Sequence, residues 1–73
     1  MDDIQLLNVV ALTEDLPEFD LYRGQVGTVV EVHRKGHFEV EFVDHMSGET
    51  YALAPVTANQ LMILHYSPIQ KSL

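Results

Sequence analysis

Residues 21–44, LYRGQVGTVVEVHRKGHFEVEFVD, alternate apolar and polar side chains on both sides of Arg34, Lys35 and Gly36. Successive side chains of a β-strand point to opposite faces, so a period of two indicates a half-buried strand. The stretch therefore predicts two strands, residues 25–33 and 37–43, joined as an antiparallel hairpin.

The two faces of this hairpin predict its register, because directly opposed residues share a face. Pairing His33 with His37 aligns the core-facing residues of both strands, which are Val26, Thr28, Val30 and Val32 in the first and Phe38, Val40 and Phe42 in the second. This register requires a three-residue loop, Arg34 to Gly36, with Gly36 at positive φ. A two-residue loop would mix the faces.

Outward from the hairpin, apolar runs predict three further strands, at residues 6–12, 50–54 and 61–65. Residues 13–24 contain Pro17 and acidic residues without a regular period, which predicts a long loop in which Pro17 ends any helical turn. Residues 55–60, PVTANQ, predict one 3₁₀ or α turn that Thr57 could cap. The order predicts an all-β fold, a small five-stranded SH3-like barrel with a long first loop and a 3₁₀ turn before the last strand.

The length of 73 residues predicts one domain. We expect an N-terminal lead-in at 1–5, the barrel at 6–65 and a C-terminal tail at 66–73. A domain this small has a modest free energy of unfolding, roughly 4–8 kcal/mol. The expected core comprises Val9, Ala11, Val26, Val30, Val32, Phe38, Val40, Phe42, Tyr51, Leu53, Leu61 and Ile63.

The charge balance indicates the kind of partner. Four Lys and Arg residues stand against eleven Asp and Glu residues, a net charge of −7. Because nucleic-acid binding depends on neutralising phosphates, a nucleic-acid partner is not expected, whereas a basic protein or a cation is. The acidic start MDDIQLL predicts neither a signal peptide nor a membrane span, and the absence of cysteine fits a cytoplasmic location. Monomer and homodimer both stay open.

The long loop is the first candidate site. It interleaves acidic residues with apolar anchors, a composition that can dock a basic and partly apolar protein. The candidate partner-binding residues are Glu14, Asp15, Leu16, Glu18, Phe19, Asp20 and Tyr22. In the alternative interpretation, Leu16, Phe19 and Leu21 belong to the core and the acidic side chains are merely solvated.

The outer face of the hairpin is the second candidate site. Two opposed histidines can share a metal ion, and the Glu31–Glu39 opposition would be relieved by a cation. The candidate metal ligands are Glu31, His33, His37 and Glu39, with Glu41 on the same face. The alternative is an ordinary solvated face. The chain lacks cysteine, a serine–histidine relay and a phosphate-binding loop, so neither an enzyme nor a cofactor is expected.

Five segments, LLNVVALTEDLPE, RGQVGTVVEV, FEVEFVD, ETYAL and ANQLMIL, together resemble domain of unknown function 4926, a family of short bacterial proteins. The resemblance covers about residues 6–64, although APVTAN and the C-terminal HYSPIQKSL differ from its pattern. It implies a small SH3-like barrel and no established reaction. Members are often encoded beside small proteins, some toxin-like, which implies an antitoxin-like or accessory role.

These observations lead to three hypotheses. The first is a non-enzymatic protein-interaction module, an antitoxin-like or accessory partner of a basic protein. The second is a metal-binding module that uses His33 and His37. The third is a KOW-like RNA-associated module, because RGQVGTVVEV is also similar to the core of KOW-type SH3-like domains.

Overall fold

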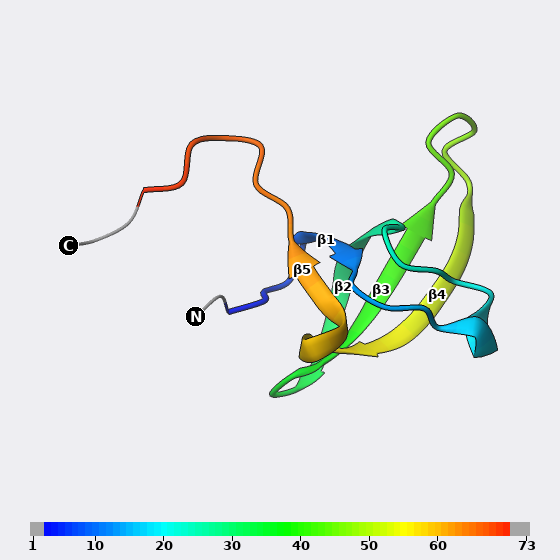
Figure 1. Cartoon of the computed structure of the whole chain (residues 1–73), viewed down its shortest axis with the longest axis horizontal. Coiled ribbons are helices and arrows are strands. Elements are labelled where there is room, and N and C mark those ends of the chain that lie inside the picture. The colour runs from blue at the N-terminus through cyan, green and yellow to red at the C-terminus, as the bar shows by residue number, and fades with distance from the viewer. Residues whose placement is uncertain (1–2, 71–73) are drawn as a thin grey trace.

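A computed structural model of the chain describes residues 3–70 and shows one five-stranded antiparallel sheet (Figure 1). Its order is β4-β3-β2-β1-β5. The strands are β1 (Val9–Leu12), β2 (Val26–Arg34), β3 (His37–Val43), β4 (Thr50–Thr57) and β5 (Leu61–Ile63), and two short 3₁₀ helices are η1 (Pro17–Phe19) and η2 (Ala58–Gln60). Within residues 3–70, β4 and β5 each pair with a strand on one side only, so the sheet is not closed.

The predicted all-β class is confirmed, and the bounds of the elements need several corrections. β3 occupies the predicted residues 37–43, whereas β1 and β5 are shorter than the predicted 6–12 and 61–65. The prediction that residues 55–60 form a turn is wrong for its first half, because β4 continues through Pro55 to Thr57. Proline lacks an N–H group and is tolerated there because β4 is an edge strand.

The 3₁₀ turn before the last strand is confirmed as η2, with Thr57 at the N-cap position and its N–H donating to Gln60 Oε1 at 3.0 Å. No helix in the described part of the chain is long and apolar enough to cross a membrane. The predicted lead-in, 1–5, and tail, 66–73, include residues 1–2 and 71–73, which lie outside the described residues.

The predicted hairpin register is confirmed at its centre and wrong at both ends. Two pairs occur as predicted, Glu31 with Glu39 and Val32 with Phe38, but Arg34 pairs with His37 and only Lys35 and Gly36 lie between them. Bulges at Val30 and His33 explain the error. Each bulge adds one residue to β2, and the bulge at Val30 places Val29, rather than Val30, opposite the buried Val40. The predicted positive φ of Gly36 is confirmed at 78°.

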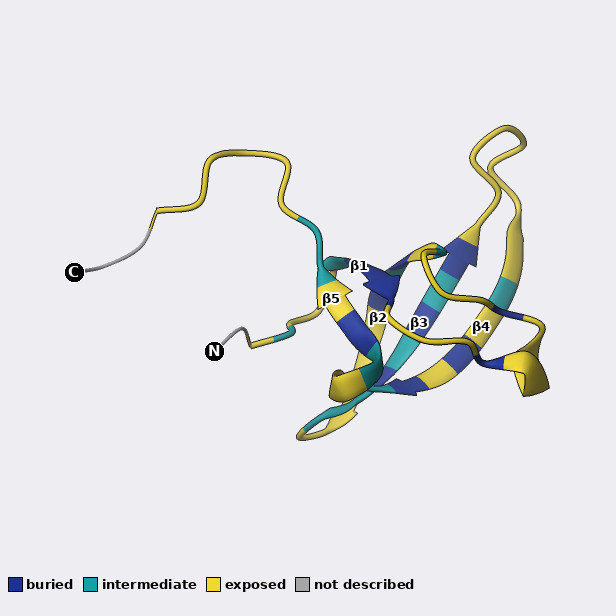
Figure 2. Ribbon diagram, viewed as in Figure 1, coloured by how far each residue is buried: buried dark blue, intermediate teal, exposed yellow. Residues whose placement is uncertain are grey.

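The core lies between one face of the sheet and the segment that joins β1 to β2 (Figure 2). Of the predicted core, Ala11, Phe38, Val40, Phe42 and Leu61 are buried, and Val9 and Ile63 are partly buried. The prediction is wrong for the exposed residues Val26, Val30, Val32, Tyr51 and Leu53. Their places are filled by Val10, Leu12, Leu16, Leu21, Val29, Ala54 and Val56.

In β4 the core face consists of Ala52, Ala54 and Val56 instead of the predicted Tyr51 and Leu53. Ala52 and Ala54 lie opposite Phe42 and Val40, the buried residues of β3, so they share their face. Tyr51 is the extra residue where the β3–β4 register shifts, between the Phe42–Ala52 and Val43–Thr50 pairs.

Gly27 marks the point where β2 crosses very close to β3. A Cβ atom at this position would lie 2.6 Å from Val40 Cγ1, 2.8 Å from the Glu41 carbonyl oxygen and 3.1 Å from Phe42 Cδ1. The β2–β3 ladder begins at the next residue, with Thr28 opposite Glu41. Before that point the two strands separate, because β2 pairs only with β1 and the end of β3 pairs only with β4.

Candidate protein-interaction site

The segment between β1 and β2 is a closed loop rather than an open connection. At its base, the Leu12 N–H donates to the Gln25 carbonyl at 2.9 Å and the Gly24 N–H donates to the Leu12 carbonyl at 2.8 Å. Nearer its tip, Leu16 and Leu21 exchange backbone hydrogen bonds of 2.8 and 3.2 Å. We call residues 13–25 the acidic loop. Its backbone is fixed at two levels, which preorganises the side chains at its tip.

The tip of the acidic loop is η1. The prediction that Pro17 ends a helical turn is wrong, because Pro17 begins one. At the first helical position the missing N–H costs nothing, since that group would have no intrahelical partner. The turn ends at Asp20, which has a left-handed conformation (φ 57°) and donates its N–H to the Pro17 carbonyl at 3.0 Å.

The apolar residues of the acidic loop divide into two groups. Leu16 and Leu21 are buried at 3% and 0% exposure and belong to the main core. Phe19 and Tyr22 are 40% and 46% exposed. The alternative interpretation therefore holds for Leu16 and Leu21 and fails for Phe19. Leu16 anchors the loop, and Phe19 and Tyr22 remain available to a partner.

Three of the four predicted acidic residues make hydrogen bonds that hold them in place. Asp15 Oδ1 accepts from the Arg23 backbone N–H at 2.9 Å. Asp20 Oδ1 accepts from the Tyr22 hydroxyl at 3.2 Å, and Glu14 Oε2 accepts from Gln60 Nε2 at 3.2 Å. Glu18 is exposed in η1 itself. Across residues 3–70 every ion pair involves His33, so no basic side chain there forms an ion pair with the acidic loop.

The Tyr22–Asp20 contact makes a testable prediction. The hydrogen bond to Asp20, and then the negative charge of Asp20, raise the pKa of Tyr22 above its ordinary value. The contribution of this contact to the stability of the folded protein is therefore fully present below the pKa that Tyr22 has in the unfolded chain. It is lost as the pH rises through the higher pKa that Tyr22 has in the folded protein. We expect Asp20→Asn to lower the pKa of Tyr22 toward its ordinary value. A titration followed by the ring carbon signals of Tyr22 measures this, and an unchanged midpoint in Asp20→Asn would contradict it.

Gln25 connects the acidic loop to β4, a link that sequence reasoning missed. Its Oε1 accepts from the Tyr22 N–H at 2.6 Å, and its Nε2 donates to the Tyr51 hydroxyl at 3.1 Å. Tyr51 was expected in the core, yet it is 48% exposed beside this contact. Gln25 therefore links the Tyr22 backbone to the exposed Tyr51 side chain of β4.

The predicted metal ligands of the hairpin are placed differently from the expected arrangement. His33 lies between two carboxylates, with Nε2 3.1 Å from Glu39 Oε1 and Nδ1 3.7 Å from Glu31 Oε2. His37 is not opposite His33, because the bulge at His33 moves Arg34 into that position. Within the described residues, no group of three or more histidine, cysteine, aspartate or glutamate side chains is arranged to hold a metal ion.

Residues 6–63 match the family model of domain of unknown function (DUF4926). No curated protein and no solved structure matches the chain. The match covers all five strands and the acidic loop.

Proposed function

We propose that the chain, which belongs to the domain of unknown function (DUF4926) family, is a non-enzymatic protein-interaction module for a basic protein. In this proposal it acts as an antitoxin-like or accessory partner. One observation carries it: the acidic loop is anchored by Leu16 and Leu21 and exposes Phe19 and Tyr22 among four acidic residues.

The physical argument rests on the composition and the rigidity of the loop. Exposed aromatic side chains surrounded by polar residues are typical of the anchors of protein interfaces. A loop whose backbone is already hydrogen-bonded loses little conformational entropy when it binds. The net charge of −7 attracts a basic partner from a distance, so association should slow as salt is added.

The test is capture of a partner from extracts of the source cell with the full chain as bait. We expect one basic protein to co-purify with the wild-type chain and to bind at least ~10-fold more weakly to Phe19→Ala, because that change removes a central anchor. Glu18→Lys should slow association and reduce its dependence on salt. Surface plasmon resonance with the purified partner measures both effects.

Asp3→Lys is the matched control for charge, because Asp3 is exposed and lies before β1, outside both the acidic loop and the β3–β4 loop. It changes the net charge by the same amount as Glu18→Lys. If the two variants alter binding equally, the loop has no special role. If no basic protein is recovered, or if Phe19→Ala binds it as the wild type does, the proposal is wrong.

Metal binding through Glu31, His33, His37 and Glu39 is the second candidate function. The observation behind it is the proximity of His33 to both Glu31 and Glu39. Binding would require His37 to move, because the described residues hold no group of three such side chains arranged for a metal ion. Calorimetric titration of the untagged chain with zinc, with His33→Ala as control, tests it. The KOW-like RNA-associated role remains a third proposal, which the charge of −7 opposes.

The finer structural and cellular predictions form part of the proposal. The strand order, together with η2 immediately before β5, supports an SH3-like barrel. The absence of cysteine supports a cytoplasmic location, and the resemblance to a family of short bacterial proteins supports a bacterial cell. The small size of the core supports a homodimer, which sedimentation equilibrium would detect.

A further inference from the structure

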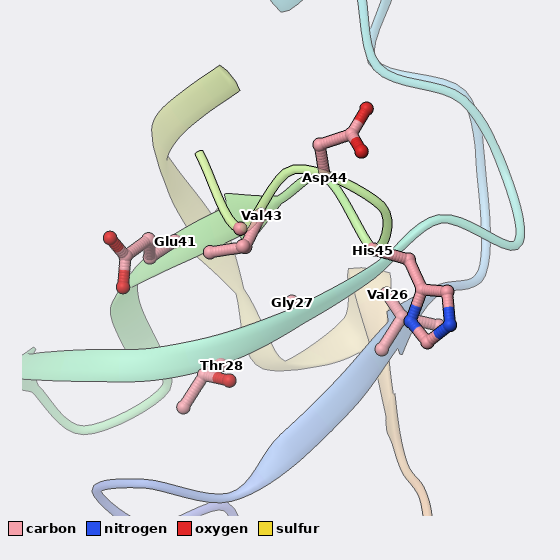
Figure 3. A pocket seen from close by; sticks show the side chains of 8 residues that line it. Val26, Gly27, Thr28, Glu41, Val43, Asp44 and His45 are labelled. Carbon is pink, nitrogen blue, oxygen red and sulfur yellow. The ribbon is translucent and has the colours of Figure 1, made fainter. Parts of the chain in front are cut away.

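On the N-terminal side of Gly27, β2 is not paired with β3, and a groove lies there on the face of the sheet opposite the core (Figure 3). Its volume is about 360 Å³, and it is lined by Val26, Thr28, Glu41, Val43, Asp44 and His45. In Figure 3, Val43 lies over Gly27, with Glu41 toward one end and His45 beside Val26 toward the other. This volume is at the lower end of small-ligand sites, about 300–1,000 Å³, and suits one long side chain.

The groove continues toward the acidic loop. A second hollow of about 450 Å³ shares Val26, Val43, Asp44 and His45 with the first and adds Gln25 and Tyr51. Gln25 is the residue that bonds both Tyr51 and the backbone of Tyr22. An extended chain lying across the second hollow would therefore reach the acidic loop and the groove together.

The wall of the groove is apolar and exposed. Val26 and Val43 are 44% and 42% exposed, although they belong to adjacent strands of one sheet. They are left open because neither side chain has a partner across the separated strands. Exposed apolar side chains that cluster in a groove are typical of binding surfaces.

Two carboxylates, those of Glu41 and Asp44, line the groove, and one oxygen of each accepts hydrogen bonds from the protein. Glu41 Oε2 accepts from the Thr50 hydroxyl at 2.5 Å, and Asp44 Oδ1 accepts from the N–H groups of Met46 and Ser47 at 2.8 and 3.0 Å. These N–H groups lower the pKa of Asp44, so it is ionised at neutral pH. Among the described residues, no lysine or arginine forms an ion pair with either carboxylate.

We propose that this groove binds the side chain of a lysine or arginine in an extended segment of the partner protein, an inference that rests on the function proposed above. The aliphatic stem lies against Val26 and Val43, and the cationic head reaches the Glu41 carboxylate at one end of the groove. The Asp44 carboxylate, which points away from Glu41 in Figure 3, adds negative charge beside the groove. Charge complementarity selects this occupant. A second copy of the chain would bring another net charge of −7 to the same surface.

The experiment uses the full ¹⁵N-labelled chain and the peptide acetyl-Val-Arg-Val-amide. We expect titration to shift the backbone NMR signals of Val26, Gly27, Val43 and His45, and the analogue acetyl-Val-Gln-Val-amide to bind at least ~10-fold more weakly. The double variant Glu41→Gln/Asp44→Asn should weaken the arginine peptide by a similar factor. Both replacements keep an acceptor oxygen for Thr50, Met46 and Ser47, so the loop is preserved.

Asp3→Asn is the control, because Asp3 is exposed and lies before β1, so the change removes a negative charge outside both the acidic loop and the groove. It should alter the affinity of the peptide less than twofold. Equal binding of the glutamine analogue, or shifts confined to residues 13–22, would overturn the groove as a cation site.

The captured partner separates this inference from the proposed function. Loss of the partner in Phe19→Ala but not in Glu41→Gln/Asp44→Asn would overturn the groove alone. Loss in both variants supports both proposals, and retention of the partner in both overturns both.

Discussion

Leu21→Ala is expected to lower the free energy of unfolding by about 2–5 kcal/mol, the range for a buried leucine replaced by alanine. Leu21 is fully buried and belongs to the main core, although it lies in a loop. The whole domain should have a free energy of unfolding of only roughly 4–8 kcal/mol. The variant should therefore be marginally folded at room temperature. Urea unfolding followed by circular dichroism measures the change.

Phe19→Ala is the control for this prediction, because Phe19 lies two residues away in the same loop and is 40% exposed. Its truncation should cost less than about 1 kcal/mol. If Leu21→Ala and Phe19→Ala lower the free energy of unfolding equally, the acidic loop is not anchored through Leu21. The comparison also separates anchoring from partner binding, since Phe19→Ala should remain folded and still lose the partner.

Gly27→Ala is expected to destabilise the domain by about 2–4 kcal/mol, near the upper end for overpacking, because the added methyl group meets backbone as well as side chains. The nearest obstacles are Val40 Cγ1 at 2.6 Å and the Glu41 carbonyl oxygen at 2.8 Å. The carbonyl belongs to a strand that is paired on its other side with β4, so it cannot move without disturbing that ladder.

Val26→Ala provides the comparison for Gly27→Ala. It changes the adjacent residue of the same strand, whose side chain is 44% exposed, and should cost less than about 1 kcal/mol. The measurement is again the midpoint and slope of urea unfolding. A loss for Gly27→Ala no larger than that for Val26→Ala would show that β2 and β3 are not in such close contact.

The sequence predicted β3 correctly because its alternation is unbroken from His37 to Val43. The prediction of the buried face failed in β2, where Val29 and Val30 are adjacent and both faces carry apolar side chains. The face predicted to be buried contains more valines, whereas the face that is buried contains Gly27, which contributes a close backbone contact instead of a side chain. A bulge leaves no mark in the amino-acid sequence that a pattern of period two can reveal, because the extra residue is an ordinary residue of the strand.

The candidate site was predictable in its composition and less so in its geometry. All four acidic side chains in residues 13–24 are exposed, as expected from acidic residues interspersed with apolar ones. Which apolar residue is an anchor depends on the Leu16–Leu21 bridge, a contact that the spacing of residues does not reveal. The groove beside Val26 depends on strand separation, which likewise follows from three-dimensional crossing rather than from a motif.

Pro55 in the edge strand β4 affects how separate molecules meet. An open sheet can template the strands of other molecules and grow into fibrils, a hazard for any unprotected edge. Along β4 the row of donors available to an incoming strand is interrupted at Pro55, and β5 offers an edge of only three residues. The molecule therefore limits ordered aggregation at both ends of its sheet without needing to close it.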